Sequence, residues 1–275
     1  FAIHEADSTC VDAAAATAAA EGLVADGVVA IMGADCSGVT KAINASVAVP
    51  NGILMVSPSA TSPALSSVPD NGTFWRTAPS DAKGGQVLAQ IALDRGITSI
   101  AVTYENSDYG KGLSEVFAAS FTSGGGTVTT NDPHENGKGD YSAEVGVLAS
   151  AGGDALAVLG YLDQAGGKIV QGALDSGAFD TFVLGDGMIG QALADSIGSD
   201  LNGSFGSVPG STSKGAAKFN ELASANGMDG TAPYVAQSYD AAALIALAIQ
   251  RGGSADKQSI LSNISRVGNA PGIKI

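Results

Sequence analysis

Polar and aromatic side chains that could do chemistry stand directly after apolar, strand-like runs of this chain. They are Ser37 in Gly33–Thr40, then Ser59, Ala60 and Thr61 in Ser57–Pro63, Tyr109 after Glu105–Asp108, Tyr161 after Gly160, and Asp186 in Gly185–Gly190. Serine hydroxyls and unpaired amides at a helix start can receive a carboxylate. Ligands of open parallel sheets bind beyond the carboxyl ends of the strands. These residues therefore predict a polar ligand site at strand tips.

Each of these features also has a plainer interpretation. Ser37 could be an ordinary helix cap. Ser57–Pro63 could be a turn fixed by its two prolines, although its hydroxyls and a free carbonyl also suit an ammonium group. Tyr109 and Tyr161 could be packing residues. Because aromatic residues make up only 5% of the chain, two tyrosines after two strand-like runs favour the ligand-site interpretation.

The segment Gly185–Gly190 matches the G-x-G-x-x-G fingerprint of dinucleotide-binding folds. The match is weak, because Asp186 stands where a pyrophosphate would approach and no acidic ribose ligand ends a following strand. We expect instead that the glycines allow Asp186 to face the ligand. A nucleotide-dependent enzyme remains the alternative from another functional class.

Other catalytic and metal-binding arrangements are not indicated by the sequence. The two histidines, His4 and His134, fall in a strand-like run and in a Gly/Asn-rich segment, and no G-x-S-x-G nucleophile elbow is present. Two cysteines and two histidines are too few and too scattered for a zinc site. We therefore expect no enzyme activity, no metal and no cofactor.

Composition narrows the class of partner. The chain has 275 residues, of which 45% are hydrophobic, and a formal net charge of −14. A surface this acidic repels phosphate backbones and anionic lipids, so we expect neither nucleic-acid nor membrane binding. The longest apolar run of the late helical segment, Ala241–Ile249, is about half of what a bilayer crossing requires.

The cysteines Cys10 and Cys36 each follow a strand-like run, Phe1–Glu5 and Val28–Gly33, with a helical segment between them. If those strands were parallel neighbours, the loops after them would leave the sheet at the same edge. A disulfide there would indicate an oxidising compartment. Two separate buried thiols are the alternative.

Short apolar runs alternate with amphipathic stretches along the chain, which is typical of parallel sheets covered by helices. The predicted strands are Phe1–Glu5, Val28–Met32, Ile53–Val56, Ser99–Tyr104, Thr127–Thr130, Ala155–Leu159 and Thr181–Leu184. The predicted helices are Val11–Asp26, Val39–Val47, Asp81–Asp94, Gly110–Phe121, Tyr141–Ala149, Gln164–Leu174, Ile189–Ile197, Lys214–Asn226, Pro233–Arg251 and Asp256–Ser265.

The alternation breaks at Phe74–Asp81 and at the Gly/Ser/Pro-rich stretch Gly203–Ser213. These breaks predict an α/β protein of two lobes. We assign residues 1–78 and 209–270 to lobe 1, and residues 79–208 and 271–275 to lobe 2. The crossings are expected near Ala78–Ser80, Val208–Ser211 and Pro271.

The chain resembles the periplasmic leucine/isoleucine/valine-binding family, the type I solute-binding proteins of ABC transporters. Seven segments in register carry the resemblance: ADCSGVT, GILMVSPSATSPAL, FWRTAPSDAKGG, YENSDYGKGL, LGYLDQAG, VLGDGM and SYDAAALI. The resemblance implies two Rossmann-like lobes, joined by hinge crossings, that close on a ligand. It also implies that Cys10 and Cys36 are bridged.

The resemblance also implies roles for the candidate residues. Ser37 would bind a ligand α-carboxylate. The Ser59 carbonyl and the Thr61 hydroxyl, with Ala60 between them, would receive the α-ammonium. Asp186 would supply the countercharge from the other lobe, and Tyr109 and Tyr161 would be pocket aromatics there. Several family members carry Glu at the position of Asp186.

The function implied is capture of a branched-chain or similar amino acid outside the cytoplasm by a monomer that delivers it to an ABC permease. A sensor of the same fold that binds an amide, urea or aromatic acid is the alternative. Compared with the family, the chain begins at the second strand and ends at the third crossing. We therefore expect a removed signal peptide and further sequence at both ends.

Overall fold

The computed structural model describes residues 2–268. They form two compact units, and each is described by itself. Unit 1 takes its described residues from the ranges 2–61, 65–79 and 211–268, and unit 2 from the ranges 62–64 and 80–210. The predicted crossing near Pro271, and with it the assignment of 271–275, lies outside the described residues.

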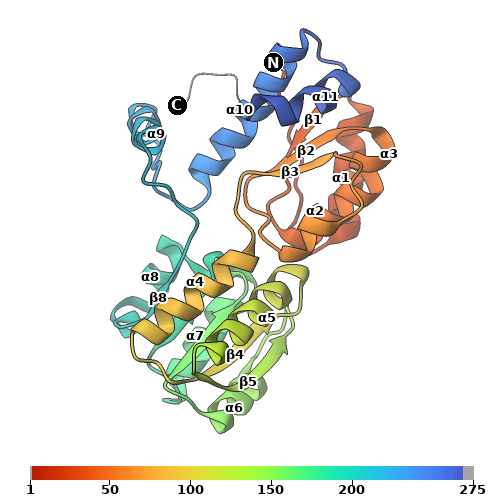
Figure 1. Ribbon diagram of the computed structural model, residues 1–275. Coiled ribbons are helices and arrows are strands. Elements are labelled where there is room, and N and C mark those ends of the chain that lie inside the picture. The colour runs from red at the N-terminus through yellow and green to blue at the C-terminus, as the bar shows by residue number, and fades with distance from the viewer. Residues whose placement is uncertain (1, 269–275) are drawn as a thin grey trace. The chain divides into compact units, whose positions relative to one another are not determined.

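Unit 1 is built on a parallel sheet whose described strands follow the order β1-β2-β3 (Figure 1). The strands are β1 (Ala30–Met32), β2 (Leu54–Ser57) and β3 (Phe74–Arg76). Every residue of β2 is buried, because helices cover both faces of the sheet. These helices are α1 (Ala13–Ala25) and α2 (Ser37–Ile43) against one face, and α10 (Val235–Gly252) and α11 (Lys257–Val267) against the other.

Helix α2 continues through a π-helical turn, Asn44–Ala48, into α3 (Val49–Asn51). The wider turn accompanies a buried Asn44, whose Oδ1 accepts a hydrogen bond of 2.9 Å from the Thr73 hydroxyl. This bond ties the helix to the segment before β3. The remaining helix of unit 1, α9 (Lys214–Ala225), is capped by Ser213.

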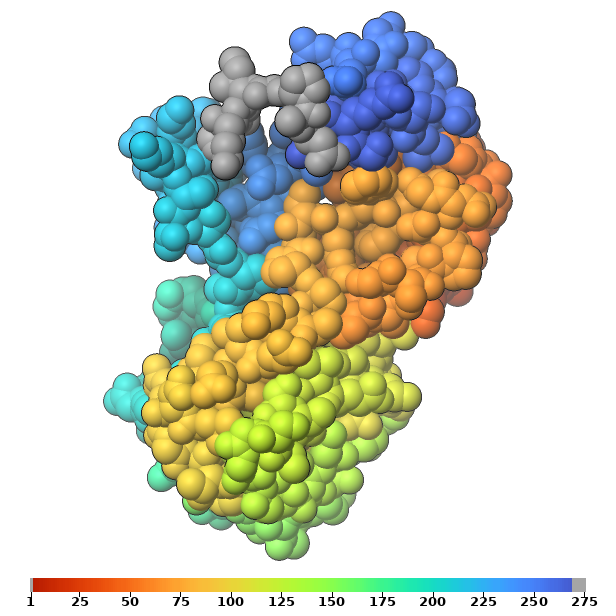
Figure 2. Space-filling view, viewed as in Figure 1, coloured from red at the N-terminus to blue at the C-terminus, as the bar shows by residue number. Residues whose placement is uncertain are grey.

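Unit 2 contains a larger parallel sheet, in which the described strands follow the order β5-β4-β6-β7-β8. They are β4 (Ser99–Glu105), β5 (Thr127–His134), β6 (Ala155–Leu159), β7 (Phe182–Leu184) and β8 (Phe205–Gly206). One face is covered by α4 (Asp81–Asp94) and α5 (Asp108–Ser123), and the other by α6 (Ser142–Ala151), α7 (Gly167–Asp175) and α8 (Gln191–Ile197). Figure 2 shows α4 and α5 side by side on the surface of unit 2.

The predicted strand Phe1–Glu5 is wrong for its described part. Residues 2–7 belong to no strand or helix, and Ile3 is 83% exposed. A strand needs a neighbour to satisfy its backbone groups, and in the described residues β1 pairs only with β2. The apolar character of this run therefore does not place it in the sheet.

Among the described residues, no helix is sufficiently long and apolar to span a bilayer. The structure also contains β8, which the sequence analysis assigned to a Gly/Ser/Pro-rich break. This strand is two residues long, and it pairs with β7 through Val183–Phe205 and Leu184–Gly206. A strand this short gives no periodic signal in the sequence.

Candidate functional site

Two loops lie side by side at the carboxyl edge of the unit 1 sheet, after β1 and after β2. The Ser57 hydroxyl donates a 2.6 Å hydrogen bond to the Ala34 carbonyl and accepts one of 3.0 Å from the Ala60 amide. The Ser59 hydroxyl donates to the Asp35 carbonyl at 3.1 Å. The predicted residues of both loops therefore belong to one polar edge of unit 1.

Ser37 is the first residue of α2 and is 1% exposed. The N-cap position belongs to Cys36, whose side chain makes no capping hydrogen bond. The alternative interpretation of Ser37 as an ordinary N-cap is therefore wrong. Its place in the first turn leaves amides of that turn without intrahelical acceptors, which is the arrangement that favours an anion.

Thr61 is 1% exposed, and its Oγ1 has no hydrogen-bond partner among the described residues. A buried hydroxyl without a partner costs about 1–3 kcal/mol, so such a group is unusual unless something else satisfies it. The neighbouring Ala60 carbonyl is already occupied, because it accepts a 3.0 Å hydrogen bond from Arg76 Nη1. Within this loop, the Thr61 hydroxyl is thus a buried polar group that no described residue satisfies.

The carboxyl edge of the unit 2 sheet brings Tyr109, Tyr161 and Asp186 together. The Tyr109 hydroxyl donates a 2.6 Å hydrogen bond to Asp186 Oδ1 and accepts one of 3.0 Å from the Gly187 amide. The rings of Tyr109 and Tyr161 stack, with centroids 4.8 Å apart and an interplanar angle of 23°. Three segments far apart in the sequence therefore form one cluster of aromatic and acidic side chains.

Burial, followed by the negative charge of Asp186, raises the pKa of Tyr109 well above its ordinary value. Tyr109 is therefore protonated at neutral pH and acts as the donor to Asp186. Asp186 is only half-buried. Its carboxylate is oriented by the hydrogen bond from Tyr109.

Two glycines of the segment Gly185–Gly190, Gly185 and Gly187, are explained by close packing around the tyrosines. A Cβ at Gly187 would lie 2.7 Å from the Gly160 carbonyl oxygen and 2.8 Å from Tyr161 Cδ1, and a Cβ at Gly185 would lie 3.0 Å from the Tyr109 hydroxyl. The distances at Gly187 are shorter than Cβ atoms show, and the distance at Gly185 would require the Tyr109 hydroxyl to shift. The G-x-G pattern therefore has a packing reason that needs no nucleotide.

Two buried polar residues behind this cluster were not predicted. Glu105, the last residue of β4, is 3% exposed, and its Oε2 accepts a 3.2 Å hydrogen bond from the Tyr161 amide. His134, opposite Glu105 in the ladder, is 1% exposed. The signal in the sequence was a carboxylate closing an otherwise apolar strand, which is rare without a partner.

The predicted disulfide is confirmed: Cys10 and Cys36 are bonded, with their Cα atoms 5.1 Å apart. The bond does not join two strand ends as the sequence analysis supposed, because residues 2–7 form no strand. Instead it links the segment before α1 to the N-cap of α2. The bond thereby restrains the loop that precedes Ser37.

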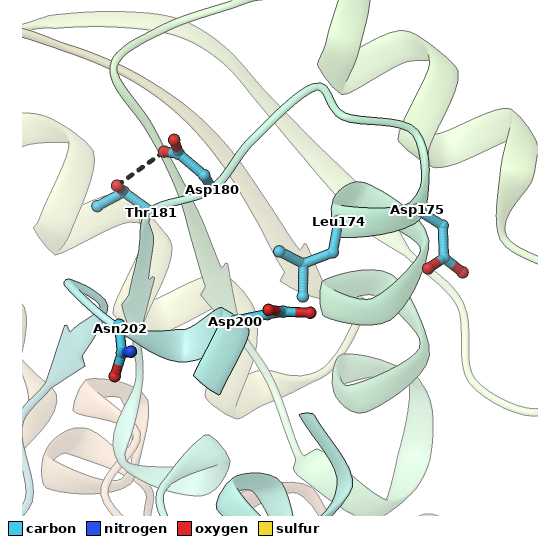
Figure 3. Close-up of a pocket in the computed structure, with 6 residues that line it drawn as sticks. All are labelled: Leu174, Asp175, Asp180, Thr181, Asp200 and Asn202. Atoms are coloured by element: carbon cyan, nitrogen blue, oxygen red, sulfur yellow. Dashed lines mark hydrogen bonds between the residues drawn. The ribbon is translucent and has the colours of Figure 1, made fainter. Parts of the chain in front are cut away.

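The hollow drawn in Figure 3 is not part of this site. It encloses about 400 Å³ and is lined by Leu174, Asp175, Asp180, Thr181, Asp200 and Asn202. Asp180 and Thr181, joined by a 3.0 Å hydrogen bond, precede β7, so the hollow lies at the opposite end of that strand from Asp186. No group of three or more potential metal ligands occurs in residues 2–268.

Two units of parallel strands covered by helices, with polar groups following the strands, define an α/β protein of the type I periplasmic binding protein class. A sequence profile of the family described as periplasmic binding protein matches residues 6–273. The chain belongs to this family, which confirms the predicted fold class and the resemblance.

Known relatives agree with this assignment. The Leu/Ile/Val-binding protein homolog 1 of Brucella melitensis is 32% identical over 249 residues, which cover 89% of this chain and 66% of the relative. Homolog 3 of the same organism is 33% identical over 168 residues, which cover 61% and 45%. The crystal structure of a leucine-binding protein from Thermotoga maritima has a TM-score of 0.83 at 27% identity, with coverage of 92% and 73%. The chain thus spans 45% to 66% of the length of these two curated relatives.

Proposed function

We propose that this protein binds a branched-chain or similar small amino acid outside the cytoplasm and delivers it to an ABC permease. The observation that carries the proposal is the Tyr109–Asp186 hydrogen bond at a strand tip of unit 2, which orients the carboxylate of the half-buried Asp186. The polar edge of unit 1 supplies the complementary groups for an anion. A zwitterion needs both.

In this proposal Ser37 and the first-turn amides of α2 receive the ligand carboxylate. The Ser59 carbonyl and the Thr61 hydroxyl receive the ammonium, beside the backbone of Ala60, and Asp186 neutralises its charge. Charge-assisted hydrogen bonds of this kind are about twice as strong as neutral ones.

Binding would proceed by closure of the two units on the ligand, which stabilises the closed form by as much as the ligand prefers it. The stacked tyrosines would contact the ligand from unit 2. Delivery to a permease follows from recognition of the closed form, and no catalytic step is required. Relatives named for leucine, isoleucine and valine binding support this ligand class.

The test is calorimetric titration of the protein with leucine, isoleucine, valine and a panel of other amino acids. Replacement of Asp186 by Ala should weaken the best ligand about a hundredfold, since a lost charge-assisted contact is worth about 2–3 kcal/mol. The matched control is Asp180→Ala, which removes a carboxylate at the other end of β7 and should leave the dissociation constant unchanged.

Two results would count against the proposal. Equal dissociation constants for the wild type and Asp186→Ala would remove Asp186 from the site. Failure of every amino acid to raise the stability of the wild-type protein would argue against the ligand class, because a ligand at about a hundred to a thousand times its dissociation constant adds about 3–4 kcal/mol.

A further inference from the structure

The end of β4 carries a carboxylate where the strand otherwise buries apolar side chains. Glu105 is 3% exposed, and the residues before it on β4 are largely buried. Burying an ionisable carboxyl group is costly unless hydrogen bonds compensate it. The hydrogen bonds of the Glu105 carboxyl therefore show what this residue holds in place.

The Glu105 side chain contacts residues of three loops, and one of these contacts reaches Tyr161. Its Oε2 accepts a 3.2 Å hydrogen bond from the amide of Tyr161, 56 residues further along the chain. Burial raises the pKa of the Glu105 carboxyl, hydrogen bonds with Asn136, the Tyr161 amide and Ser107 lower it, and the nearby Asp163 also raises it. The carboxylate is therefore the hydrogen-bond acceptor at the place where the chain leaves β6.

The backbone before Tyr161 packs closely against Glu105 and His134. A Cβ at Gly160 would lie 3.1 Å from Glu105 Cβ and 3.2 Å from His134 Nε2. His134 Nδ1 lies 2.9 Å from the Thr103 hydroxyl, and its Nε2 has no partner among the residues that the structure describes. Burial lowers the pKa of His134 to about 4, so this ring is neutral at neutral pH and gives Glu105 no countercharge.

A continuous set of contacts runs from this point to the candidate ligand site. Glu105 accepts a hydrogen bond from the Tyr161 amide, and the Tyr161 ring stacks on Tyr109. Tyr109 in turn donates a hydrogen bond from its hydroxyl to Asp186. Holding the Tyr161 backbone restricts the directions that its ring can take. The three contacts thus connect Asp186, through two tyrosines, to an acceptor outside the site.

We propose that Glu105 is a positioning residue, whose side chain holds the backbone of Tyr161 and thereby the stacked tyrosines and Asp186 for ligand binding. This inference rests on the proposed function. It adds to the proposed site a residue that touches no ligand and acts on it through the Tyr161 amide.

The test compares two substitutions in the full chain. Glu105→Gln keeps an acceptor oxygen at about the same place, whereas Glu105→Leu removes the side-chain oxygen that accepts from the Tyr161 amide. Two quantities are measured: the amide proton shift of Tyr161 in ¹⁵N-tyrosine-labelled protein, assigned with Tyr161→Phe, and the affinity for leucine. Glu135→Gln, which neutralises the exposed carboxylate beside His134, is the matched control.

For Glu105→Leu we expect a clear upfield shift of the Tyr161 amide and about tenfold weaker leucine binding. Glu105→Gln should restore both to near the wild-type values. In the wild type the amide shift should also follow the ionisation of Glu105 as pH is lowered, with Asp163 and His134 as the neighbouring titratable groups, and this titration should vanish in Glu105→Gln.

An unmoved Tyr161 amide in folded Glu105→Leu, or a moved amide with unchanged affinity, would overturn the proposal. If Glu105→Leu does not fold, Glu105→Asp, whose carboxylate is drawn back by one methylene, is judged by the same two measurements. If the wild type binds no amino acid, the proposed function fails. The affinity measurement then uses a ligand that raises the stability of the wild-type protein. The Tyr161 amide shift still tests the hydrogen bond between Glu105 and Tyr161.

Discussion

The polar edges of the two units occupy the same position in two parallel sheets, but different chemistry holds them. In unit 1 a disulfide and serine hydroxyls bound to backbone carbonyls fix the loops, and the Thr61 hydroxyl is left without a described partner. In unit 2 close-packed glycines and buried titratable groups hold the cluster, and Tyr109 already satisfies Asp186. The first edge should therefore respond to reductant and the second to acid.

The largest effect is expected from breaking the covalent restraint of unit 1. Replacing Cys10 and Cys36 together by Ser should lower the free energy of unfolding by about 3.5 kcal/mol, as the loop-entropy relation gives for a separation of 26 residues. Trp75 is the single tryptophan of the chain and lies on β3. Urea unfolding followed by its fluorescence therefore reports on unit 1.

Adding dithiothreitol to the wild type should reproduce this loss, and adding it to the double variant should change nothing. An unchanged urea midpoint of the wild type in the presence of dithiothreitol would contradict the stabilising role of the disulfide.

Acid should act on unit 2 through His134. Burial lowers its pKa to about 4 in the folded protein, against an ordinary value near 6.5. The unfolded chain therefore binds an additional proton between these values, so the stability contribution is complete above pH 6.5 and is lost as the pH falls towards 4. The loss should reach about 3 kcal/mol.

Unfolding at a series of pH values, followed by far-ultraviolet circular dichroism, measures this dependence. His134→Gln should flatten it between pH 6.5 and 4. His4→Gln, at the exposed second histidine, should leave it as in the wild type. Equal slopes in all three proteins would refute the prediction.

The close packing of unit 2 can be tested within one short segment. Gly187→Ala should destabilise the protein by about 1–3 kcal/mol, because the added Cβ meets the Gly160 carbonyl and the Tyr161 ring. Gly190→Ala is the matched control, since no atom lies within 4 Å of the position of its Cβ among the described residues. Thermal denaturation of the two variants compares them, and similar melting temperatures would show that the packing explanation is wrong.

The smallest effects should have opposite signs in the two units. Thr61→Val removes a buried hydroxyl without a described partner, so the unliganded protein should keep its stability or gain up to about 1 kcal/mol. Tyr109→Phe takes one partner from Asp186 and one from the Gly187 amide, and should cost about 1–2 kcal/mol. Denaturant unfolding without ligand measures the free energy of unfolding of both variants. A loss of stability in Thr61→Val as large as that in Tyr109→Phe would contradict the predicted difference between the two units.

Much of the fold follows from patterns that the sequence displays. The helix predicted at Asp81–Asp94 has these bounds in the structure, because Ser80 caps its start and an apolar stripe continues to its end. The buried runs at Ser99–Glu105 and Ala155–Leu159 are strands covered on both faces. The predicted strand Phe1–Glu5 is wrong for its described residues 2–5, which have no neighbour in the described sheet. A local sequence pattern does not show which distant segments pair.

The candidate site was predictable as a set of positions and not as a set of contacts. Tyr109 and Asp186 could be selected because each follows a strand, but the hydrogen bond between them spans 77 residues. Glu105 was overlooked because its partner is a backbone amide, which no residue type reveals. The roles assigned to Ser37, Ser59, Ala60 and Thr61 stay predictions.

The way the chain is divided between the units has a consequence for its biosynthesis. Unit 2 draws nearly all its residues from one continuous stretch, Ser80–Gly210, whereas the strands of unit 1 precede that stretch and helices α10 and α11 follow it. On the ribosome, unit 2 should therefore complete its core first. Leu54 and Val56 of β2 would remain uncovered on one side until α10 and α11 emerge. The early strands of unit 1 should therefore be the segment most in need of chaperone protection during translation.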